Sequence, residues 1–526
     1  MIIRSPVPDL AIPENVSVPE FVLQHAKDLP NKPALIDGPS GRTLTYAQLA
    51  GAVRMAAAGL ADRGFGKGDV FAIYSPNLPE YAIAFLAVAT LGGIVTTVNP
   101  LYTVNELTHQ MKDAGAQYIL TVPPFLPNAL EAAKVTGMKE VFVFGEAEGA
   151  TPFAALLKSS GNVPAVQIDP KNDLIVLPYS SGTTGLPKGV MLTHYNLIAN
   201  ILQTVNAKAD GIMATGDDTL LGLLPFYHIY GMVVIMFMGT YLGCTIVTMP
   251  RFDMEQFLTI LQKYEVTYAH LVPPVILGLA KHPLVDNYNL SKLRVIFSGA
   301  APLGGEVENA AAKRLGVLVS QGYGMTEASP VTHSRPYMPP PGKPGSIGPC
   351  LPNTECRIVD PASGEDLGVG KEGELWLRGP QVMKGYLNNP TASAITVDRE
   401  GWLHTGDIAY VDEDGHFFIV DRLKELIKYK GMQVAPAELE ALLLTHPQIA
   451  DAAVIGRPDE EAGEVPKAFV VLKGELSTDE IKRFVAERVA PHKRLRDVEV
   501  IAQIPKSASG KILRRVLLQQ EKEKNQ

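Results

Sequence analysis

The chain contains little cysteine and no excess of positive charge. Its three cysteines among 526 residues, Cys244, Cys350 and Cys356, are too few for the disulfide framework of a small secreted domain, so we expect reduced thiols. Lysine and arginine number 47 against 55 aspartates and glutamates, which leaves a net charge of −8. Because nucleic-acid surfaces need clustered basic residues, this balance argues against a nucleic-acid partner.

Long apolar runs that could cross a membrane are also lacking. Two uncharged stretches, 81–105 and 219–250, are interrupted by glycine, proline or threonine, and the second contains His228. Each divides into a helix-like part and a β-branched part, which is typical of buried α/β layers. The first residues have no apolar core of signal-peptide length, and the last carry no address tripeptide. We therefore expect a cytoplasmic protein with no membrane span.

Several catalytic signatures are missing as well. The sequence has no G-x-S-x-G turn, no H-x₃-H pair among its eleven histidines, and no zinc-type spacing of its cysteines. The glycines of 368–373 fit G-x-G-x-x-G, but a predicted strand at 374–377 follows them. A dinucleotide site needs a helix there, so we reject that reading.

Strand-like and helix-like stretches alternate through most of the chain. With 46% apolar residues the chain can bury large cores, and its length suggests two to four domains. Thr45 can cap a helix over 46–63, which a predicted strand at 70–74 and a helix at 79–91 follow. The alternation continues through predicted strands at 267–271 and 293–297. It predicts parallel sheets with helices on both faces.

The alternation ends at the proline-rich segment 336–344. Short strand-like runs after it predict a small β-rich unit, and the last hundred residues, with a proline-initiated helix at 436–445, predict a separate α+β unit. The predicted fold class is therefore α/β: a large N-terminal region of parallel-type sheets with helices, plus a small β-rich unit, and a small α+β C-terminal domain. We expect an N-terminal domain over 1–420, a boundary at 421–424, and a C-terminal domain over 425–526.

The most informative stretch is Ser180–Gly189, which follows a predicted strand. It holds four serine or threonine hydroxyls, three glycines and Lys188. Glycines let backbone N–H groups turn towards an anion, hydroxyls add donors, and the lysine adds charge, so the stretch predicts a phosphate-binding loop. It is not a Walker A motif, because Pro187 precedes the lysine and Gly189 follows it.

This loop resembles the signature of the adenylate-forming superfamily, which includes acyl-CoA synthetases, beetle luciferases and peptide-synthetase adenylation domains. Further motifs match that superfamily in its order and cover nearly the whole chain: Leu224–Gly231, Gln321–Glu327, Trp402–Asp407, Asp421–Gly431 and Pro505–Lys511. The closest subfamily is that of 4-coumarate:CoA ligases, on the evidence of Ser298–Leu303, Met325–Glu327 and Lys428–Glu440.

The resemblance implies a ligase that uses ATP, Mg²⁺ and coenzyme A. A carboxylate attacks the α-phosphorus of ATP to give acyl-AMP and pyrophosphate, and the thiol of coenzyme A then displaces AMP. Because an anion attacks a polyanion in the first step, cations and hydrogen-bond donors should dominate the site. The implied partners are a small carboxylic acid, ATP and coenzyme A, and we expect a monomer or homodimer.

The resemblance also assigns residues to the nucleotide. Those implied for its β- and γ-phosphates are Ser180, Ser181, Gly182, Thr183, Thr184 and Lys188. Tyr323 would stack on adenine, and Asp407 would accept hydrogen bonds from the ribose hydroxyls with Arg422 in support. Thr326 would contact the α-phosphate, and Glu327 would bind Mg²⁺. Further residues of the nucleotide site would be Ala300, Gln321 and Gly322.

Lys511 is the implied catalyst of adenylation, because an ammonium between carboxylate and phosphate offsets their repulsion. His228 would gate the acid and thiol channels. The family changes from the first step to the second by rotating a mobile C-terminal domain, with Lys424 at the hinge and Lys428 and Gln433 on the segment that the rotation presents. The positions that match those near coenzyme A are Arg251, Lys430 and Gly431.

The acid pocket departs from that of hydroxycinnamate ligases. Tyr230, Ala300 and Gly322 match pocket positions, with Tyr230 facing the phenol, but the residues 231–234 after it are apolar. An apolar wall leaves a phenolic hydroxyl unpaired at a cost of roughly 1–3 kcal/mol, which favours less polar aryl or aliphatic acids. The nearest named activity is that of a 4-coumarate:CoA ligase. The alternatives are a medium- or long-chain fatty acyl-CoA ligase and a stand-alone adenylation module that loads a carrier protein.

Overall fold

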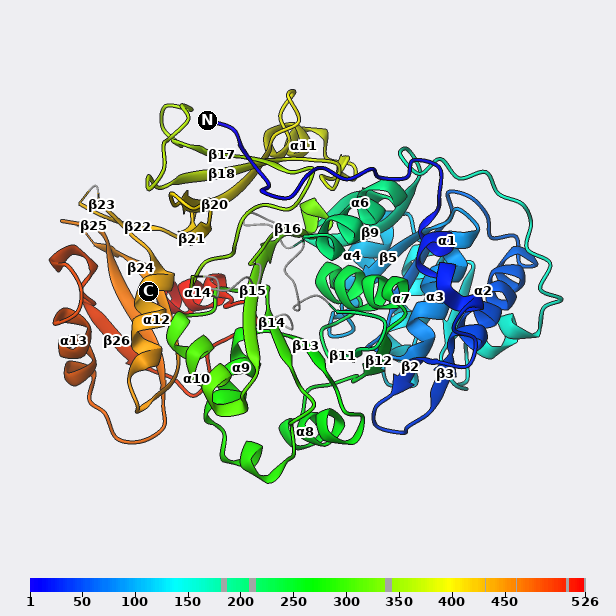
Figure 1. The fold of residues 1–526 in the computed structure, drawn as a ribbon, viewed down its shortest axis with the longest axis horizontal. Coiled ribbons are helices and arrows are strands. Elements are labelled where there is room, and N and C mark those ends of the chain that lie inside the picture. The colour runs from blue at the N-terminus through cyan, green and yellow to red at the C-terminus, as the bar shows by residue number, and fades with distance from the viewer. Residues whose placement is uncertain are drawn as a thin grey trace.

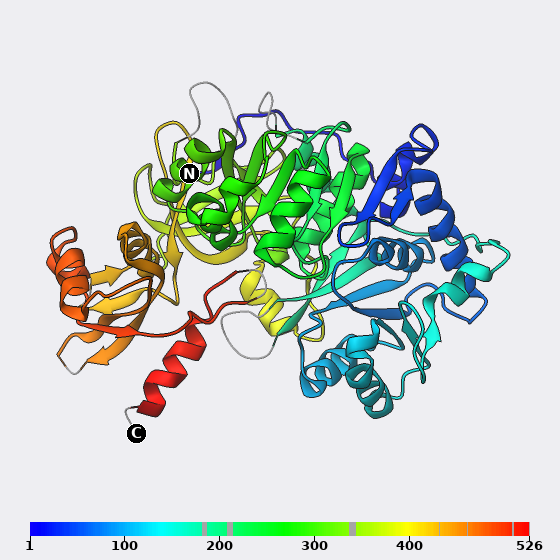
Figure 2. The same cartoon turned by 90° about the horizontal axis from the view of Figure 1, so that it is seen from below.

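The computed structural model describes residues 1–180, 187–207, 214–335, 343–430, 432–459, 461–507 and 510–524. Figure 1 shows a broad body of sheets and helices and, beside it, a smaller lobe formed by the chain after about residue 425, coloured orange to red. Figure 2 shows the same lobe from below, with the last helix projecting from it.

The first sheet has the strand order β19-β10-β9-β5-β4-β6-β7-β8. Its strands are β4 (Val70–Tyr74), β5 (Ile94–Val98), β6 (Tyr118–Thr121), β7 (Glu140–Val143), β8 (Thr151–Pro152), β9 (Leu174–Ser180), β10 (Lys188–Thr193) and β19 (Gly385–Tyr386). The central pairs are parallel, whereas β10 pairs antiparallel with both of its neighbours.

The second sheet has the order β16-β15-β14-β13-β11-β12-β2-β3. Its strands are β2 (Pro33–Asp37), β3 (Thr43–Thr45), β11 (Thr219–Gly222), β12 (Thr245–Thr248), β13 (Tyr268–Leu271), β14 (Val295–Ser298), β15 (Leu318–Gly324) and β16 (Val331–Ser334). The edge strands β3 and β16 are antiparallel to their neighbours. Both sheets are thus mixed, with antiparallel pairs at β10, β19, β3 and β16, whereas the edge strand β8 is parallel to β7.

Two further sheets follow. The β-rich unit has the order β1-β17-β18-β20-β21, and the C-terminal lobe has β23-β22-β25-β24 with β26 on β25. The strands are β1 (Ile3–Arg4), β17 (Glu355–Val359), β18 (Gly373–Arg378), β20 (Leu403–Val411), β21 (Phe417–Arg422), β22 (Ile427–Tyr429), β23 (Met432–Val434), β24 (Ile449–Asp459), β25 (Gly463–Leu472) and β26 (Asp497–Val500). The predicted fold class is confirmed, although the pairing of β1 with β17 in the β-rich unit was not predicted.

Helices pack against these sheets. The α-helices are α1 (Val18–Val22), α2 (Tyr46–Ala61), α3 (Pro79–Thr90), α4 (Val104–Ala114), α5 (Leu126–Thr136), α6 (His194–Val205), α7 (Met238–Leu242), α8 (Met254–Lys263), α9 (Pro273–Lys281), α10 (Gly305–Leu315), α11 (Pro390–Thr396), α12 (Pro436–Thr445), α13 (Thr478–Ala486) and α14 (Arg514–Lys524). A π-helical segment covers Tyr230–Phe237, and 3₁₀ turns cover Gln24–Lys27, Pro123–Phe125, Phe153–Lys158, Pro283–Asn287, Thr326–Ala328 and Pro491–Lys493. Within the described ranges, no helix combines the length and the apolar composition needed to cross a bilayer.

Local signals fix the ends of several of these helices. The Thr45 hydroxyl accepts a hydrogen bond from the Gln48 amide at 3.3 Å, and the Gln48 side chain accepts one from the Thr45 amide at 2.9 Å, so the predicted cap of α2 is confirmed. The helix predicted over 79–91 is α3, and that predicted over 436–445 is α12. Both begin with proline, whose missing N–H costs nothing in a first turn.

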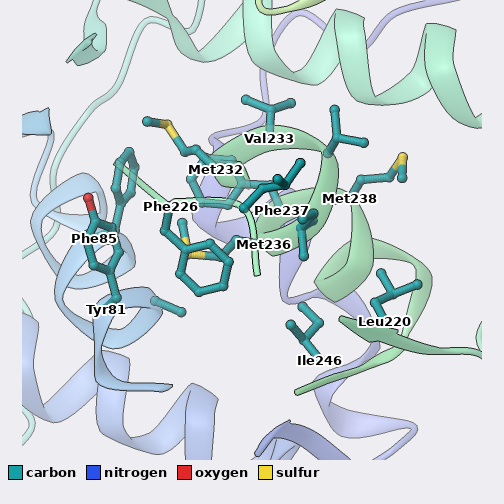
Figure 3. Close-up of a cluster of buried hydrophobic side chains, with 14 of the residues drawn as sticks. Tyr81, Phe85, Leu220, Phe226, Met232, Val233, Met236, Phe237, Met238 and Ile246 are labelled. Atoms are coloured by element: carbon teal, nitrogen blue, oxygen red, sulfur yellow. The ribbon is translucent and has the colours of Figure 1, made fainter. Parts of the chain in front are cut away.

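The largest core joins the first two sheets. The π-helical segment contributes Met232, Val233, Met236 and Phe237, which pack against side chains of α3, β11 and β12 (Figure 3). The rings of Phe85 and Phe237 meet edge to face with centroids 5.0 Å apart. This packing is why the uncharged stretch 219–250 is so apolar, and it anchors the helical segment that follows His228.

Candidate active site

A pocket lies between the π-helical segment and one face of strands β13–β15. It holds about 700 Å³ of empty space, part of it open to solvent. His228, Tyr230 and Val234 line it from the helical side, and Tyr268, His270 and Phe297 line it from the sheet. These three sheet residues share one face, since Tyr268 and His270 are two apart on β13 and His270 pairs with Phe297 on β14.

Two residues without large side chains keep this pocket open near the start of the helical segment. A Cβ atom at Gly299 would lie 2.5 Å from Cε1 of Tyr230, and one at Gly322 would lie 2.9 Å from Cζ of Phe297. Any larger residue would displace these rings. Ala300, which also lines the pocket, has a φ of +70°, which L-residues rarely adopt.

The first carboxylate near Lys511 belongs to Asp407. Asp407 on β20 is 8% exposed; it accepts a hydrogen bond from the Tyr323 hydroxyl and lies 3.5 Å from Nε of Arg422, its register partner on β21. Burial raises the pKa of the Asp407 carboxyl, while Arg422 and the Tyr323 hydrogen bond act against that rise. The arrangement presents a buried carboxylate whose remaining lone pairs can accept hydrogen bonds from a diol.

A second carboxylate, Glu327, is 5% exposed and accepts a hydrogen bond of 2.9 Å from the Tyr386 hydroxyl. Nζ of Lys188 lies 5.4 Å from the centroid of the Tyr386 ring. Lys188 begins β10 and pairs in register with Ser180 at the end of β9, so the two described ends of the predicted phosphate-binding stretch lie side by side. Ser181, Gly182, Thr183 and Thr184 lie outside the described residues.

Lys511 reaches this pocket from the C-terminal lobe and lines it beside Tyr323 and Thr326. Its loop is closed by hydrogen bonds from the Ser507 amide to the Lys511 carbonyl (2.8 Å) and from the Lys511 amide to the Ser507 hydroxyl (3.1 Å). Gly510 has a φ of +78°, and a Cβ there would sit 3.3 Å from the side chain of Val272. The loop therefore lies directly against the N-terminal region.

Lys511 interacts electrostatically with several charged or titratable residues of the site. Burial and Arg422 lower the pKa of its ammonium, whereas Asp407 and Glu327 act in the opposite direction. Burial, with a smaller effect of Lys511, lowers the pKa of His228 to about 3, so His228 is neutral at pH 7. Residues from positions 228, 327, 407 and 511 thus share one electrostatic environment.

Other predicted residues lie elsewhere. Lys428 and Gln433 face each other across the β22–β23 hairpin and are exposed, as are Lys424 and Lys430. Arg251 is exposed in the loop after β12, and Gly431 lies outside the described residues. The Gln321 side chain hydrogen-bonds the backbone of Leu303 at 3.4 Å instead of lining the pocket.

The sheet side of the predicted acid pocket was not anticipated from the sequence. The Tyr230 hydroxyl lies 3.2 Å from Nδ1 of His270 and donates to the Phe297 carbonyl at 3.4 Å, so the wall is not purely apolar. Burial lowers the pKa of His270 to about 3. The alternation Tyr268-Ala-His270 in a predicted strand was the available signal, but it did not reveal which face of the sheet meets the pocket.

Known proteins share these features along almost the whole chain. Residues 22–387 match the family model of the AMP-binding enzymes, and residues 438–511 match that of the AMP-binding enzyme C-terminal domain. Among curated proteins, 4-coumarate–CoA ligase 1 of Solanum tuberosum is 44% identical over 98% of this chain and 96% of its own. The 4-coumarate–CoA ligase 3 of Oryza sativa subsp. japonica is 45% identical over 98% and 94%.

Solved structures give the same result. The anthranilate CoA ligase AuaEII in complex with anthranoyl-AMP superposes with a TM-score of 0.89 at 26% identity, over 97% of this chain and 98% of its own. ATP-bound MatB from Rhodopseudomonas palustris superposes with a TM-score of 0.88 at 28% identity, over 97% and 100%.

Proposed function

The chain belongs to the AMP-binding enzyme family and is an AMP-forming acid:CoA ligase, and we propose that its acid is an aryl acid of the cinnamic type. In the first step the acid carboxylate attacks the α-phosphorus of ATP, the bond to the bridging oxygen breaks, and pyrophosphate leaves. In the second step the thiol of coenzyme A loses its proton and attacks the acyl carbon, and AMP leaves. The products are acyl-CoA, AMP and pyrophosphate.

The observation that supports these roles most strongly is that Lys511 lines the pocket from the C-terminal lobe and lies within the electrostatic field of Asp407 and Glu327. We assign Asp407 to the ribose hydroxyls and Lys511 to the α-phosphate and the attacking carboxylate. A preformed ammonium in a partly dehydrated site stabilises charge as it develops without first reorganising water. Tyr323, held by its hydrogen bond to Asp407, is positioned to stack on adenine.

Glu327 is the residue that we propose for magnesium. One of its oxygens accepts the Tyr386 hydrogen bond, and the other remains an oxygen ligand of the kind that Mg²⁺ prefers. In the described ranges no cluster of three or more potential metal-binding side chains occurs. A magnesium ion would therefore be held jointly by Glu327, water and the ATP phosphates, and it would supply charge neutralisation of the leaving pyrophosphate.

For the second step we propose a rotation of residues 425–526 against 1–420 about the segment 421–424. Lys428 and Gln433 are then presented to the pocket in place of Lys511, and Lys424 acts as the pivot. Their present exposure on a hairpin outside the pocket is consistent with that role. The residues that we place near coenzyme A are Arg251, Lys430 and Gly431.

The aryl preference rests on the pocket walls. Tyr230, Tyr268 and Phe297 present rings, and rings pack against an aromatic acid over a large apolar area at little entropic cost. The 4-coumarate–CoA ligases of Solanum tuberosum and Oryza sativa subsp. japonica are similar to this chain over nearly its whole length. A fatty acyl-CoA ligase is the second candidate, favoured by the flexible Met238 side chain in the same pocket, which adapts to alkyl chains.

We also propose a reducing, cytoplasmic compartment, because the three cysteines are buried free thiols. Cell fractionation in the source organism tests this. Recovery with a secreted fraction would contradict it.

The catalytic proposal is tested by pyrophosphate release across cinnamic, hydroxycinnamic, benzoic and C6–C16 acids, with and without coenzyme A. We expect ATP-dependent release with cinnamic-type acids and formation of their CoA thioesters. Turnover confined to aliphatic acids would identify a fatty acyl-CoA ligase. Acyl-AMP formation without transfer to free coenzyme A would identify a module that loads a carrier protein.

A further inference from the structure

Asp421 connects the β-rich unit to the C-terminal lobe. It lies on β21 next to Arg422, and successive strand residues point to opposite faces. Arg422 therefore faces Asp407 and the nucleotide end of the site, whereas Asp421 faces away from it. Asp421 is only 6% exposed, so the groups around its carboxylate must satisfy it.

Oδ1 of Asp421 accepts a hydrogen bond of 2.7 Å from the neighbouring Arg422 amide, and the partner of Oδ2 is the start of helix α12. Oδ2 of Asp421 accepts a hydrogen bond of 2.8 Å from the amide of Ala437, the second residue of that helix. The first amides of a helix have no partner inside it, and the residue before α12, Ala435, has no side chain that could cap them. A carboxylate from a strand sixteen residues earlier thus serves as the cap of α12.

A buried cation supports the same arrangement. Arg514, three residues after Lys511, donates to Glu425 and to both oxygens of Glu440 at 2.7 Å, and to the Val454 carbonyl at 3.1 Å. Burial raises the pKa of the Asp421 carboxyl, and the nearby Arg514 acts against that rise. Arg514 therefore links the loop that carries Lys511 to α12, whose N-terminus Asp421 holds.

Apolar contacts also connect the β-rich unit to the C-terminal lobe. Ile408 of β20 forms a small buried cluster with Leu426 and Ala435, which lie on either side of the β22–β23 hairpin. Asp421 and Ile408 are register partners, so one pair of neighbouring strand residues supplies both the polar and the apolar contact. The Asp421–Ala437 hydrogen bond and the Ile408 cluster join β20 and β21 to elements that follow residue 424, whereas the partners of Arg514 lie within the C-terminal lobe.

We propose that Asp421 is a positioning residue, which holds the C-terminal lobe in the acyl-AMP-forming arrangement by capping α12 across the hinge. The inference rests on the proposed function and its domain rotation. In the second arrangement α12 turns away with the lobe, so Ala437 leaves Asp421 and the capping contact is lost. Asp421 contributes to the equilibrium between the two arrangements, and in our proposal it contacts none of the acid, ATP and coenzyme A.

The test separates the two half-reactions in the full-length enzyme. Acid-dependent pyrophosphate release reports the first, and thioester formation from chemically prepared cinnamoyl-AMP and coenzyme A reports the second. Because a capping contact shifts an equilibrium by about 5- to 30-fold, Asp421→Ala should slow the first reaction by that factor while leaving the second unchanged or faster. Asp421→Asn, which keeps an acceptor but loses the charge, should lie between wild type and Asp421→Ala.

A matched control removes a comparable cap that does not cross the hinge. Ser477 caps α13 inside the same lobe, and its hydroxyl accepts from the Glu480 amide at 3.3 Å. Ser477→Ala should leave the ratio of the two rates at its wild-type value. Equal losses in both half-reactions of Asp421→Ala, or the same change of ratio in Ser477→Ala, would overturn the inference. A wild-type enzyme that releases no pyrophosphate with any acid would instead refute the proposed function.

Discussion

Lys511→Met removes the ammonium from the nucleotide end of the pocket and keeps most of the apolar side chain. The residue lines the pocket, and its charge lies within the field of Arg422, Asp407 and Glu327. The wild-type structure already accommodates this cation at the cost of a lowered pKa. Replacing it with a neutral side chain should therefore not unfold the lobe, and the thermal midpoint should change little.

The expected kinetic effect is large and confined to one step. Removing a single preorganised donor from a developing negative charge costs about 3–4 kcal/mol, or ~10²–10³ in rate. Acid-dependent pyrophosphate release should fall by at least that factor. Thioester formation from prepared acyl-AMP should stay within about twofold of wild type, because in our proposal Lys511 has left the pocket at that stage.

The matched control is Lys522→Ala, an exposed lysine in the helix that follows the same loop. It should leave both half-reactions unchanged. Pyrophosphate release by Lys511→Met at close to the wild-type rate would remove Lys511 from the adenylation step. An equal loss in both half-reactions would show that the residue acts through the structure of the lobe.

Three further outcomes are expected. Lys428→Ala should slow transfer to coenzyme A more than acyl-AMP formation. Its side chain now lies on an exposed hairpin outside the pocket, and in our proposal only the rotation for the second step brings it to the pocket. Equal losses in both steps would count against the domain rotation. Asp407→Ala should weaken ATP binding by ~10- to 100-fold through the loss of charge-assisted hydrogen bonds, and an unchanged ATP dependence would refute the ribose assignment. Acid should destabilise the fold, because burial lowers the pKa of His194 to about 4 and of His333 to about 3, so the folded state binds fewer protons than the unfolded state below pH 6.5. Each should cost about 2 kcal/mol at pH 5 relative to pH 7, and a denaturant midpoint that stays constant over that range would contradict this.

The helices and strands of the fold were largely predictable, since their signals are local. Thr45 and Gln48 form the cap that the sequence predicted, and the proline-initiated helix at 436–445 begins and ends as expected. The antiparallel edges of the sheets were not predicted. Pairing such as that of β1 with β17, more than 350 residues apart, leaves no local trace in the sequence.

The candidate site likewise contains residues that were predicted from the sequence and residues that were not. Ser180–Gly189 was predicted to bind phosphate from its residue types and spacing, whereas the roles of Asp407 and Lys511 came from the resemblance to the adenylate-forming superfamily and stay predictions. His270 was missed, although its strand was predicted, because a strand's alternation reveals that two residues share a face but not what that face meets. The cap of α12 by Asp421 was equally invisible, since the acceptor lies outside the helix's own sequence.

The amino-acid sequence by itself determined which reactive groups this protein carries: the hydroxyls, glycines and lysine of Ser180–Gly189, the carboxylates of Glu327 and Asp407, and the ammonium of Lys511. Only the tertiary structure decided which of these act together. Dihedral preferences and caps operate over a few residues, whereas the approach of Lys511 to Asp407 depends on strand order and on the packing of Gly510 against Val272. Long-range burial of apolar surface brings these residues together, and no short segment of the sequence specifies that burial.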